Sequence, residues 1–259
     1  MNPSRNGNFT SSGIVALTGI DKREMTESEL LERKKTHPTS KAKLIEDVNV
    51  LPKTASTYIR DKNWERKAKR SLGTGTTGRA CWWGKVAELQ AFNVLPTDYD
   101  LSSNSTESHP SIKFWCGSRD GLKHDEGRTV YDIKCPYTLE SYFTFADCKT
   151  IEEVRLNHKD GEKYYWQLVS NSCISNTKYA ELIVYCPYQD ELKEIRELAS
   201  NYVSDLNKVS WIHFSLDEDL PYLNRDGEYS NLHIIRFEVS QEDKDFLTKR
   251  VIQAGKLLV

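Results

Sequence analysis

Two short segments decide the fold and chemistry predicted for this chain, Ser118-Arg119-Asp120-Gly121-Leu122 and Val130-Tyr131-Asp132-Ile133-Lys134-Cys135-Pro136. The β-branched residues Val130 and Ile133 give the second segment strand character. Alternate side chains of a strand share one face, so Asp132 and Lys134 are expected to point the same way. The Gly-Leu turn after Asp120 predicts a hairpin that returns this carboxylate toward Asp132. The sequence therefore brings two carboxylates and an ammonium group together.

Clustered carboxylates suit a hard divalent cation such as Mg²⁺ or Mn²⁺, which prefers oxygen ligands. The neighbouring Lys134 favours a catalytic site over a structural one. Phosphodiester hydrolysis needs a group that orients or deprotonates the attacking water and offsets negative charge. The alternative is a surface hairpin with an Asp-Lys ion pair, which is the commoner setting for an isolated D-x-K triplet.

Composition describes an ordinary soluble protein. The chain has 259 residues, of which 38% are hydrophobic and 29% charged, enough for one large domain or one domain with an extension. It has no apolar run long enough to span a membrane, and its polar start does not resemble a secretory signal. We therefore expect a cytoplasmic protein, in the host cell if the chain is viral.

The six cysteines are widely spaced and form no C-x-x-C pair or Cys/His cluster. We expect free thiols and exclude a zinc or iron-sulfur site built from them. Charge is uneven along the chain. Residues 22–79 hold 15 Lys/Arg and 8 Asp/Glu, a balance of +7 within a total of -2. This excess indicates either a phosphate-facing surface or the solvated faces of helices.

The apolar pattern and the capping residues predict alternating helices and strands without internal repeats. Helices are predicted over residues 13–19, 26–35, 54–72, 79–94, 137–147, 162–170, 189–207 and 240–257. Strands are predicted over residues 112–116, 128–135, 179–185 and 231–239. The glycine-rich stretch 73–78 lacks the lysine and spacing of a P-loop, so it is interpreted as a flexible connection.

Three further polar positions stand out. Glu88 lies among apolar residues of a predicted helix, where an inward carboxylate is costly unless it is paired or metal-bound. This makes it a candidate third acidic group, although the helix pattern alone favours an exposed Glu88. Ser12 precedes a short apolar helix and, with Arg5, could bind an anion at the helix start, although capping alone explains the serine. Gln167 could simply be a polar residue on a packed helix.

Taken together, four motifs resemble the PD-(D/E)XK nuclease superfamily, and within it the YqaJ-type viral recombinases and bacteriophage lambda exonuclease. They are Trp83-Gly84-Lys85-Val86-Ala87-Glu88, the Ser118–Leu122 segment, Asp132-Ile133-Lys134-Cys135-Pro136-Tyr137, and Gln167 in its aromatic helix. The resemblance implies an α/β restriction-endonuclease-like core with a central mixed β-sheet flanked by helices. A single nuclease domain would cover residues 1–259, with a variable basic helical insertion at about residues 20–78.

The resemblance also implies roles for individual residues. Asp120, Asp132 and the backbone carbonyl of Ile133 would bind metal, Glu88 would bind or orient the metals, and Lys134 would position or activate water. Gln167 would support that lysine or the scissile strand, and a 5′-phosphate pocket would comprise Arg5, Ser12 and Ser118. The chain departs from the family pattern at Arg119, where proline is usual, and at Asp132, where glutamate predominates. Only four residues precede Arg5, so we expect no counterpart of the family's strand-separating N-terminal wedge.

The implied function is Mg²⁺-dependent 5′ to 3′ exonuclease action on double-stranded DNA ends in phage-type recombination. It would use two metal ions, for which Mn²⁺ can substitute. An endonuclease of the same fold is the main alternative, and a non-catalytic DNA-binding module is a second. The resemblance further implies a homo-oligomer, a ring-shaped trimer, and a single-strand annealing protein as partner.

Overall fold

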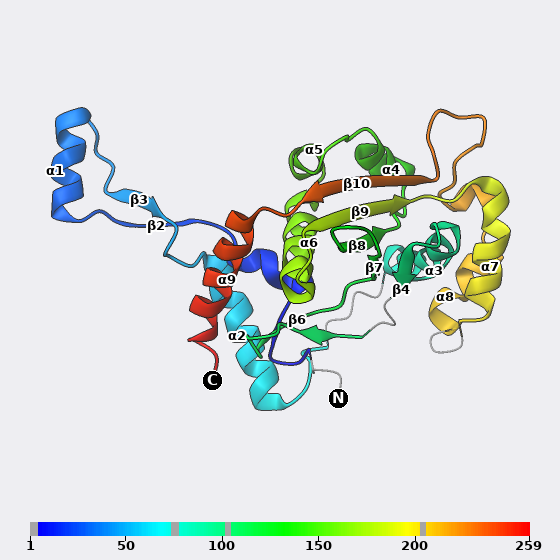
Figure 1. The fold of residues 1–259 in the computed structure, drawn as a ribbon, viewed down its shortest axis with the longest axis horizontal. Helices are drawn as coiled ribbons and strands as arrows, with labels where there is room; N and C mark the ends of the chain where they lie inside the picture. The colour runs from blue at the N-terminus through cyan, green and yellow to red at the C-terminus, as the bar shows by residue number, and fades with distance from the viewer. Residues whose placement is uncertain (1–4, 74–77, 102–104, 203–205) are drawn as a thin grey trace.

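The computed structural model describes residues 5–73, 78–101, 105–202 and 206–259. Its centre is a five-stranded sheet with the order β10-β9-β8-β7-β4. The parallel pair is β8 (Thr129–Lys134) with β9 (Tyr179–Tyr185), and the other neighbours run antiparallel. The remaining strands of this sheet are β4 (Tyr99–Leu101), β7 (Gly121–Lys123) and β10 (Leu232–Glu238). This mixed sheet with flanking helices confirms the predicted α/β fold class (Figure 1).

The alternation of side chains along β8 divides the apolar core into two layers. Val130 packs in a cluster with residues of α6 (Gly161–Ser175). Tyr131 and Ile133 pack in the other cluster, with residues of α3 (Arg79–Val94) and α7 (Leu192–Ser200). Because successive strand residues point to opposite faces, Asp132 lies on the α6 side of the sheet.

A smaller sheet with the order β1-β6-β5 carries the N-terminal segment. Its strands are β1 (Phe9–Thr10), β5 (Glu107–Ser108) and β6 (Trp115–Gly117). The 3₁₀ helix η1 (Ser11–Leu17) follows β1 and packs against α6 and α2 (Lys53–Ala68). The hydroxyls of Ser11 and Ser170 lie 2.9 Å apart across this contact. The N-terminal segment is thereby held next to α6.

The C-terminal half supplies most of the remaining helices. Near the sheet's β9–β10 edge lie α4 (Leu139–Ala146) and α5 (Ile151–Asn157), and α9 (Gln241–Gly255) packs on α6 (Figure 1). Gly161, the first residue of α6, lies in close contact with α5. A Cβ at this position would lie 2.1 Å from the Val154 carbonyl oxygen. A glycine is therefore required where the two helices meet. The other elements are η2 (Gln189–Glu191), α8 (Leu206–Phe214) and η4 (Asp217–Asp219).

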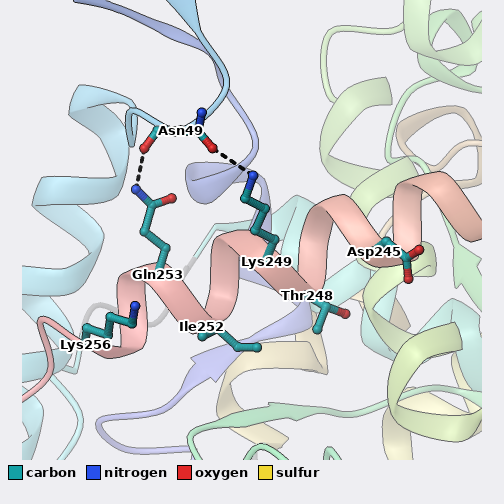
Figure 2. A pocket seen from close by; sticks show the side chains of 7 residues that line it. All are labelled: Asn49, Asp245, Thr248, Lys249, Ile252, Gln253 and Lys256. Carbon is teal, nitrogen blue, oxygen red and sulfur yellow. Dashed lines mark hydrogen bonds between the residues drawn. The ribbon is translucent and has the colours of Figure 1, made fainter.

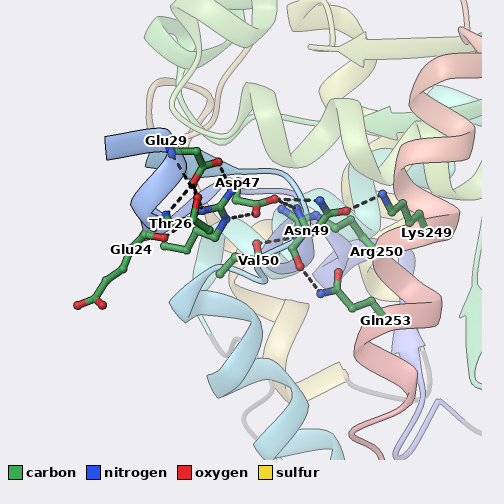
Figure 3. Close-up of polar contacts among 10 residues, drawn as sticks. Glu24, Thr26, Glu29, Asp47, Asn49, Val50, Lys249, Arg250 and Gln253 are labelled. Atoms are coloured by element: carbon green, nitrogen blue, oxygen red, sulfur yellow. Dashed lines mark hydrogen bonds and ion pairs between the residues drawn. The ribbon is translucent and has the colours of Figure 1, made fainter. Parts of the chain in front are cut away.

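Residues 20–50 form an arm that extends away from both sheets (Figure 1). It contains β2 (Asp21–Glu24), α1 (Glu27–Thr36) and β3 (Leu44–Asp47), with β2 and β3 antiparallel. No residue of α1 is buried, so polar contacts hold the arm together. The Arg23 guanidinium donates to two carboxylates that are labelled in Figure 3, to Glu29 at 2.7 and 2.8 Å and to Asp47 at 2.6 Å. Hydrogen bonds from Arg23 and from Thr26 hold the pKa of Glu29 near 2.

The arm is fastened at its base to α9. Arg250, which is 1% exposed, donates to the carbonyl oxygens of Gly19 and Val50, at the two ends of the arm. Lys249 donates to the side-chain oxygen of Asn49 at 2.7 Å, and Gln253 donates to its backbone oxygen (Figure 2). These contacts border a surface cavity of about 440 Å³. One face of α9 therefore fixes where the arm leaves the core.

Several predicted boundaries were wrong. The helix predicted over 54–72 ends at Ala68, because Lys69 adopts a left-handed conformation with φ of 52°. The helix predicted over 189–207 is divided, since α7 ends at Ser200 and a second helix begins at Leu206, while residues 203–205 lie outside the described residues. The strand predicted over 112–116 begins only at Trp115. The connection predicted at 73–78 falls mostly on residues 74–77, which also lie outside the described residues.

Other elements were missed altogether. Strands β2 and β3 are four-residue, largely charged segments in which the apolar alternation that marks a strand is weak. The short helix α5 was also missed, although Thr150 and Glu153 form a capping box at its start. The segment predicted as a helix over 13–19 is a 3₁₀ helix. All six cysteines are free, as expected.

No helix among the described residues combines the length and apolar character needed to cross a bilayer.

Replacing Arg250 with methionine should loosen the base of the arm. Two carbonyl oxygens would lose a charged donor, and we expect a loss of about 3 kcal/mol in unfolding free energy. Trypsin should cut the arm faster in R250M than in the wild type, measured by mass spectrometry of the first fragments. Lys249→Met is the control, because it removes one exposed hydrogen bond. Equal cleavage rates in R250M and wild type would contradict this anchoring.

Candidate active site

The hairpin of β7 and β8 brings Asp120 to the end of β8, as predicted. Gly121 is opposite Tyr131 in the antiparallel register, which leaves Asp120 at the start of β7 beside the second half of β8. Asp120 Oδ2 accepts a hydrogen bond from the backbone N–H of Ile133 at 2.7 Å. Strand β8, which carries Asp132, therefore also fixes the position of the Asp120 carboxylate.

Asp132 is the most enclosed of the predicted site residues, with 1% of its surface exposed. Its Oδ1 accepts a hydrogen bond from Gln167 Nε2 of α6 at 2.6 Å. Its Oδ2 forms an ion pair with Lys134. The Gln167 amide thus contacts Asp132, a partner that the sequence did not predict for it. Helix α6 thus fixes the orientation of the Asp132 carboxylate.

The Lys134 side chain is 22% exposed and lies at the mouth of the site. Burial disfavours its ammonium form, but the charges of Asp132 and Asp120 prevail and raise the pKa of Lys134 above its ordinary value. Its Nζ also lies 5.1 Å from the centre of the Tyr164 ring. The ammonium form of Lys134 is therefore favoured in the metal-free protein.

Glu88 faces inward from α3, as the apolar context of its helix suggested. Burial raises the pKa of Glu88 to about 7, with the Asp132 charge adding to the effect and Lys134 opposing it. Burial also raises the pKa of Asp120 well above its ordinary value, and the charges of Asp132 and Glu88 raise it further. Glu88, Asp120 and Asp132 therefore lie close enough to affect one another, and the nearby positive charge does not offset the burial of Glu88 and Asp120.

This donor set fits a hard divalent cation. Asp120, Asp132 and the Ile133 carbonyl supply only oxygen atoms, the ligands that Mg²⁺ and Mn²⁺ prefer. Asp132 Oδ2 is buried without a hydrogen-bond donor and is balanced by the Lys134 ammonium alone. Among the described residues, however, no three His, Cys, Asp or Glu side chains are already gathered closely enough to enclose a metal ion. A bound ion would therefore draw the carboxylates together and compete with Lys134 for Asp132.

A cavity of about 460 Å³ lies beside these groups, although Asp120 and Asp132 themselves do not line it. Five elements or connections contribute to its wall, namely η1, α3, the end of β8, α4 and α6. The predicted site residues that line it are Ser12, Glu88, Ile133, Lys134 and Gln167. Arg5 lies next to this wall, since its guanidinium donates to Ser12 Oγ at 3.2 Å. Ser12, from the N-terminal segment, and Gln167, from the last of the predicted motifs, therefore line the same cavity.

Ser118 does not join them. It does not line the cavity, and its hydroxyl lies 3.0 Å from that of Thr106. Arg119, which stands where the family pattern has proline, pairs with Glu107 and donates to Ser175 at 3.0 Å. The structure thus places Arg5 beside Ser12, whereas Ser118, like Asp120 and Asp132, does not line the cavity.

Sequence reasoning missed other residues of the cavity wall. Lys85, Lys163, Tyr164 and Ser141 all line it. Tyr164 precedes Gln167 by three positions on the same helix, so the i, i+3 spacing could have identified it. Ser141 belongs to the first turn of α4, and only the tertiary structure shows that this turn borders the cavity.

The fold resembles those of known nucleases, although no protein-family model and no curated protein matches the sequence. A crystal structure described as a phage-related exonuclease from Haemophilus somnus 129PT aligns with a TM-score of 0.57 at 14% identity, covering 96% of this chain and 92% of that one. The alkaline exonuclease LHK-Exo from Laribacter hongkongensis aligns with a TM-score of 0.53, also at 14% identity, covering 98% and 89%. Its complex with dAMP aligns with a TM-score of 0.52. At this identity the likeness concerns the fold.

The raised pKa of Glu88 predicts how the metal-free protein responds to pH. A carboxyl whose folded pKa is about 7 instead of 4.5 contributes stability below pH 4.5, and that contribution is lost as the pH rises to 7. Glu88→Gln should therefore melt at a higher temperature than the wild type at pH 8 in chelator, and at about the same temperature at pH 4.5. Circular dichroism melts test this. A less stable E88Q at pH 8 would mean that the ionised Glu88 is well paired.

Proposed function

We propose that this protein is a Mg²⁺-dependent deoxyribonuclease that degrades double-stranded DNA from its ends in the 5′ to 3′ direction. The observation that carries the proposal is the buried Asp132, which accepts a hydrogen bond from Gln167 and pairs with Lys134. Both of these partners line a cavity that Glu88 also lines. The exonuclease descriptions of the structurally similar proteins support this choice among the nucleases. A role in phage-type recombination follows from the resemblance of the motifs.

Asp120, Asp132 and the Ile133 carbonyl would hold the divalent ions, and Glu88 would bind or orient them from α3. Bound there, such ions activate water for attack and offset the charge that develops on the phosphodiester. Each aspartate has a fixed orientation before any ion binds. Asp120 is held by the Ile133 N–H, and Asp132 is held by Gln167.

Lys134 would act as a cationic donor. As an ammonium, it would hold the attacking water or a phosphate oxygen by a hydrogen bond. Lys134 pairs with Asp132 and also lines the cavity, so it would lie close to a substrate bound there.

Arg5 and Ser12 would receive the 5′-phosphate of the strand being degraded. A guanidinium matches phosphate oxygens in geometry and charge, and the serine hydroxyl adds a donor at the cavity wall. This pair supports an end-directed enzyme over the alternative endonuclease. Assembly as a homo-oligomer around DNA and a single-strand annealing partner remain parts of the proposal that rest on the family resemblance.

Digestion of end-labelled linear duplex beside covalently closed circles tests the proposed activity. With Mg²⁺ the protein should release nucleotides from 5′ ends and leave circles intact, and excess chelator should stop it. Asp132→Asn should lower the rate about a thousandfold or more, because it removes the charge that binds both Lys134 and the metal. Asp190→Asn, which alters an exposed ion pair with Arg225, is the control. Cut circles would indicate the endonuclease, and full activity of D132N would refute the assigned site.

The 5′-phosphate pocket has its own test. Linear duplexes with a 5′-phosphate should be degraded faster than those with a 5′-hydroxyl, and Arg5→Ala should reduce that preference about tenfold, since it removes one charged hydrogen bond. Initial rates on the two substrates measure the preference. Arg60→Ala, on the outer side of α2, serves as a charge-matched control. A preference that survives in R5A would exclude Arg5 from the pocket.

A further inference from the structure

A second cavity, of about 280 Å³, lies between the start of α4 and the end of α5. Its lining residues are Thr138, Glu140, Ser141, Thr144, Asn157, His158 and Lys159. Ser141 also lines the catalytic cavity, which makes it the residue common to both. None of the roles assigned above uses this second space.

His158 forms the inner wall and has one determined tautomer. It is 7% exposed and stacks on Phe145 with ring centres 4.0 Å apart. The backbone N–H of Asp160 donates to His158 Nδ1 at 3.1 Å, so this nitrogen is an acceptor. Burial lowers the pKa of His158 and favours the neutral ring. A neutral imidazole with an accepting Nδ1 carries its hydrogen on Nε2.

The tautomer of His158 determines what Ser141 can offer. His158 Nε2 lies 3.3 Å from Ser141 Oγ, so the imidazole donates and the serine oxygen accepts. The hydroxyl hydrogen of Ser141 then points away from the histidine. Its backbone N–H is already bonded to Thr138 Oγ1 at 3.2 Å. Ser141 therefore presents an oriented O–H donor at the boundary of the two cavities.

The chemistry around this donor suits a nucleotide. The exposed Lys159 adds an ammonium at the rim, where phosphate oxygens would accept from it and from Ser141. Asn157 and Glu140 offer both donors and acceptors, which match the edge of a base. The Thr144 hydroxyl is directed to the Glu140 carbonyl oxygen at 2.8 Å and is used within α4.

We infer that the space between α4 and α5 is a nucleotide subsite that holds the nucleotide next to the scissile phosphodiester, with the Ser141 hydroxyl donating to its phosphate. The inference rests on the proposed nuclease function, because it assigns the neighbouring cavity to the scissile bond. His158 acts through Ser141 and is a positioning residue. A free deoxynucleoside 5′-monophosphate occupies the same subsite and competes with DNA.

Ser141→Ala tests the subsite with linear duplex as substrate and dAMP as competitor. The loss of one hydrogen bond to phosphate should raise both KM and the dAMP inhibition constant about tenfold, with kcat changed by less than about twofold. Ser141→Thr, which keeps the hydroxyl, should restore both constants. Ser200→Ala is a matched control, since Ser200 forms a similar pair with His213 Nδ1 at 2.9 Å on α7 and α8. That variant should behave like the wild type.

Lys159→Gln provides a second variant on an exposed side chain that folding does not need, and it should weaken dAMP inhibition about threefold. Unchanged KM and dAMP inhibition in S141A, or a fall in kcat alone, would overturn the inference while leaving the nuclease function intact. Calorimetric titration with dAMP separates the two ideas. Binding that depends on Ser141 in a protein without DNA hydrolysis would support the subsite and refute the proposed function.

Discussion

The buried carboxylate of Asp132 is the constraint on which the rest of the site depends. Removing a charge from water costs several kcal/mol, and a buried carboxylate persists only with partners of good geometry. Lys134 supplies the opposite charge from the same strand, and Gln167 supplies a hydrogen bond from α6. The position of α6 relative to β8 is therefore tightly constrained. Val130 packs in the apolar cluster that includes residues of α6, and α6 is also in close contact with α5 at Gly161.

Negative charge is concentrated around this pair beyond what one lysine balances. Asp120 and Glu88 approach from the hairpin and from α3, and both carboxyls have raised pKa values because they are buried near other carboxylates. Such an arrangement reduces the stability of the empty protein at neutral pH and is typical of a site that binds a cation. The strain is tolerated because the two apolar layers on either side of the sheet supply the folding energy.

Much of the candidate active site was predictable because its parts are close in sequence. The period of two along a strand placed Asp132 and Lys134 on one face, and the turn after Asp120 predicted the returning hairpin. The arm was not predictable in the same way. Its strands show little apolar alternation, its helix buries nothing, and ion pairs of Arg23 hold it together. The break between α7 and α8 was missed because a charged helical pattern seemed continuous across it.

By itself, the sequence determined the α/β order and the strand with its acid and lysine, since local periodicity and turn chemistry govern these features. Only the tertiary structure decided which distant groups meet. Gln167 contacts Asp132, and Ser12 lines the cavity beside Arg5. Ser118 contacts Thr106 and does not line the cavity, and Ser141 lines both cavities. Contacts of this kind depend on how helices pack across a sheet, and no short sequence pattern encodes that packing.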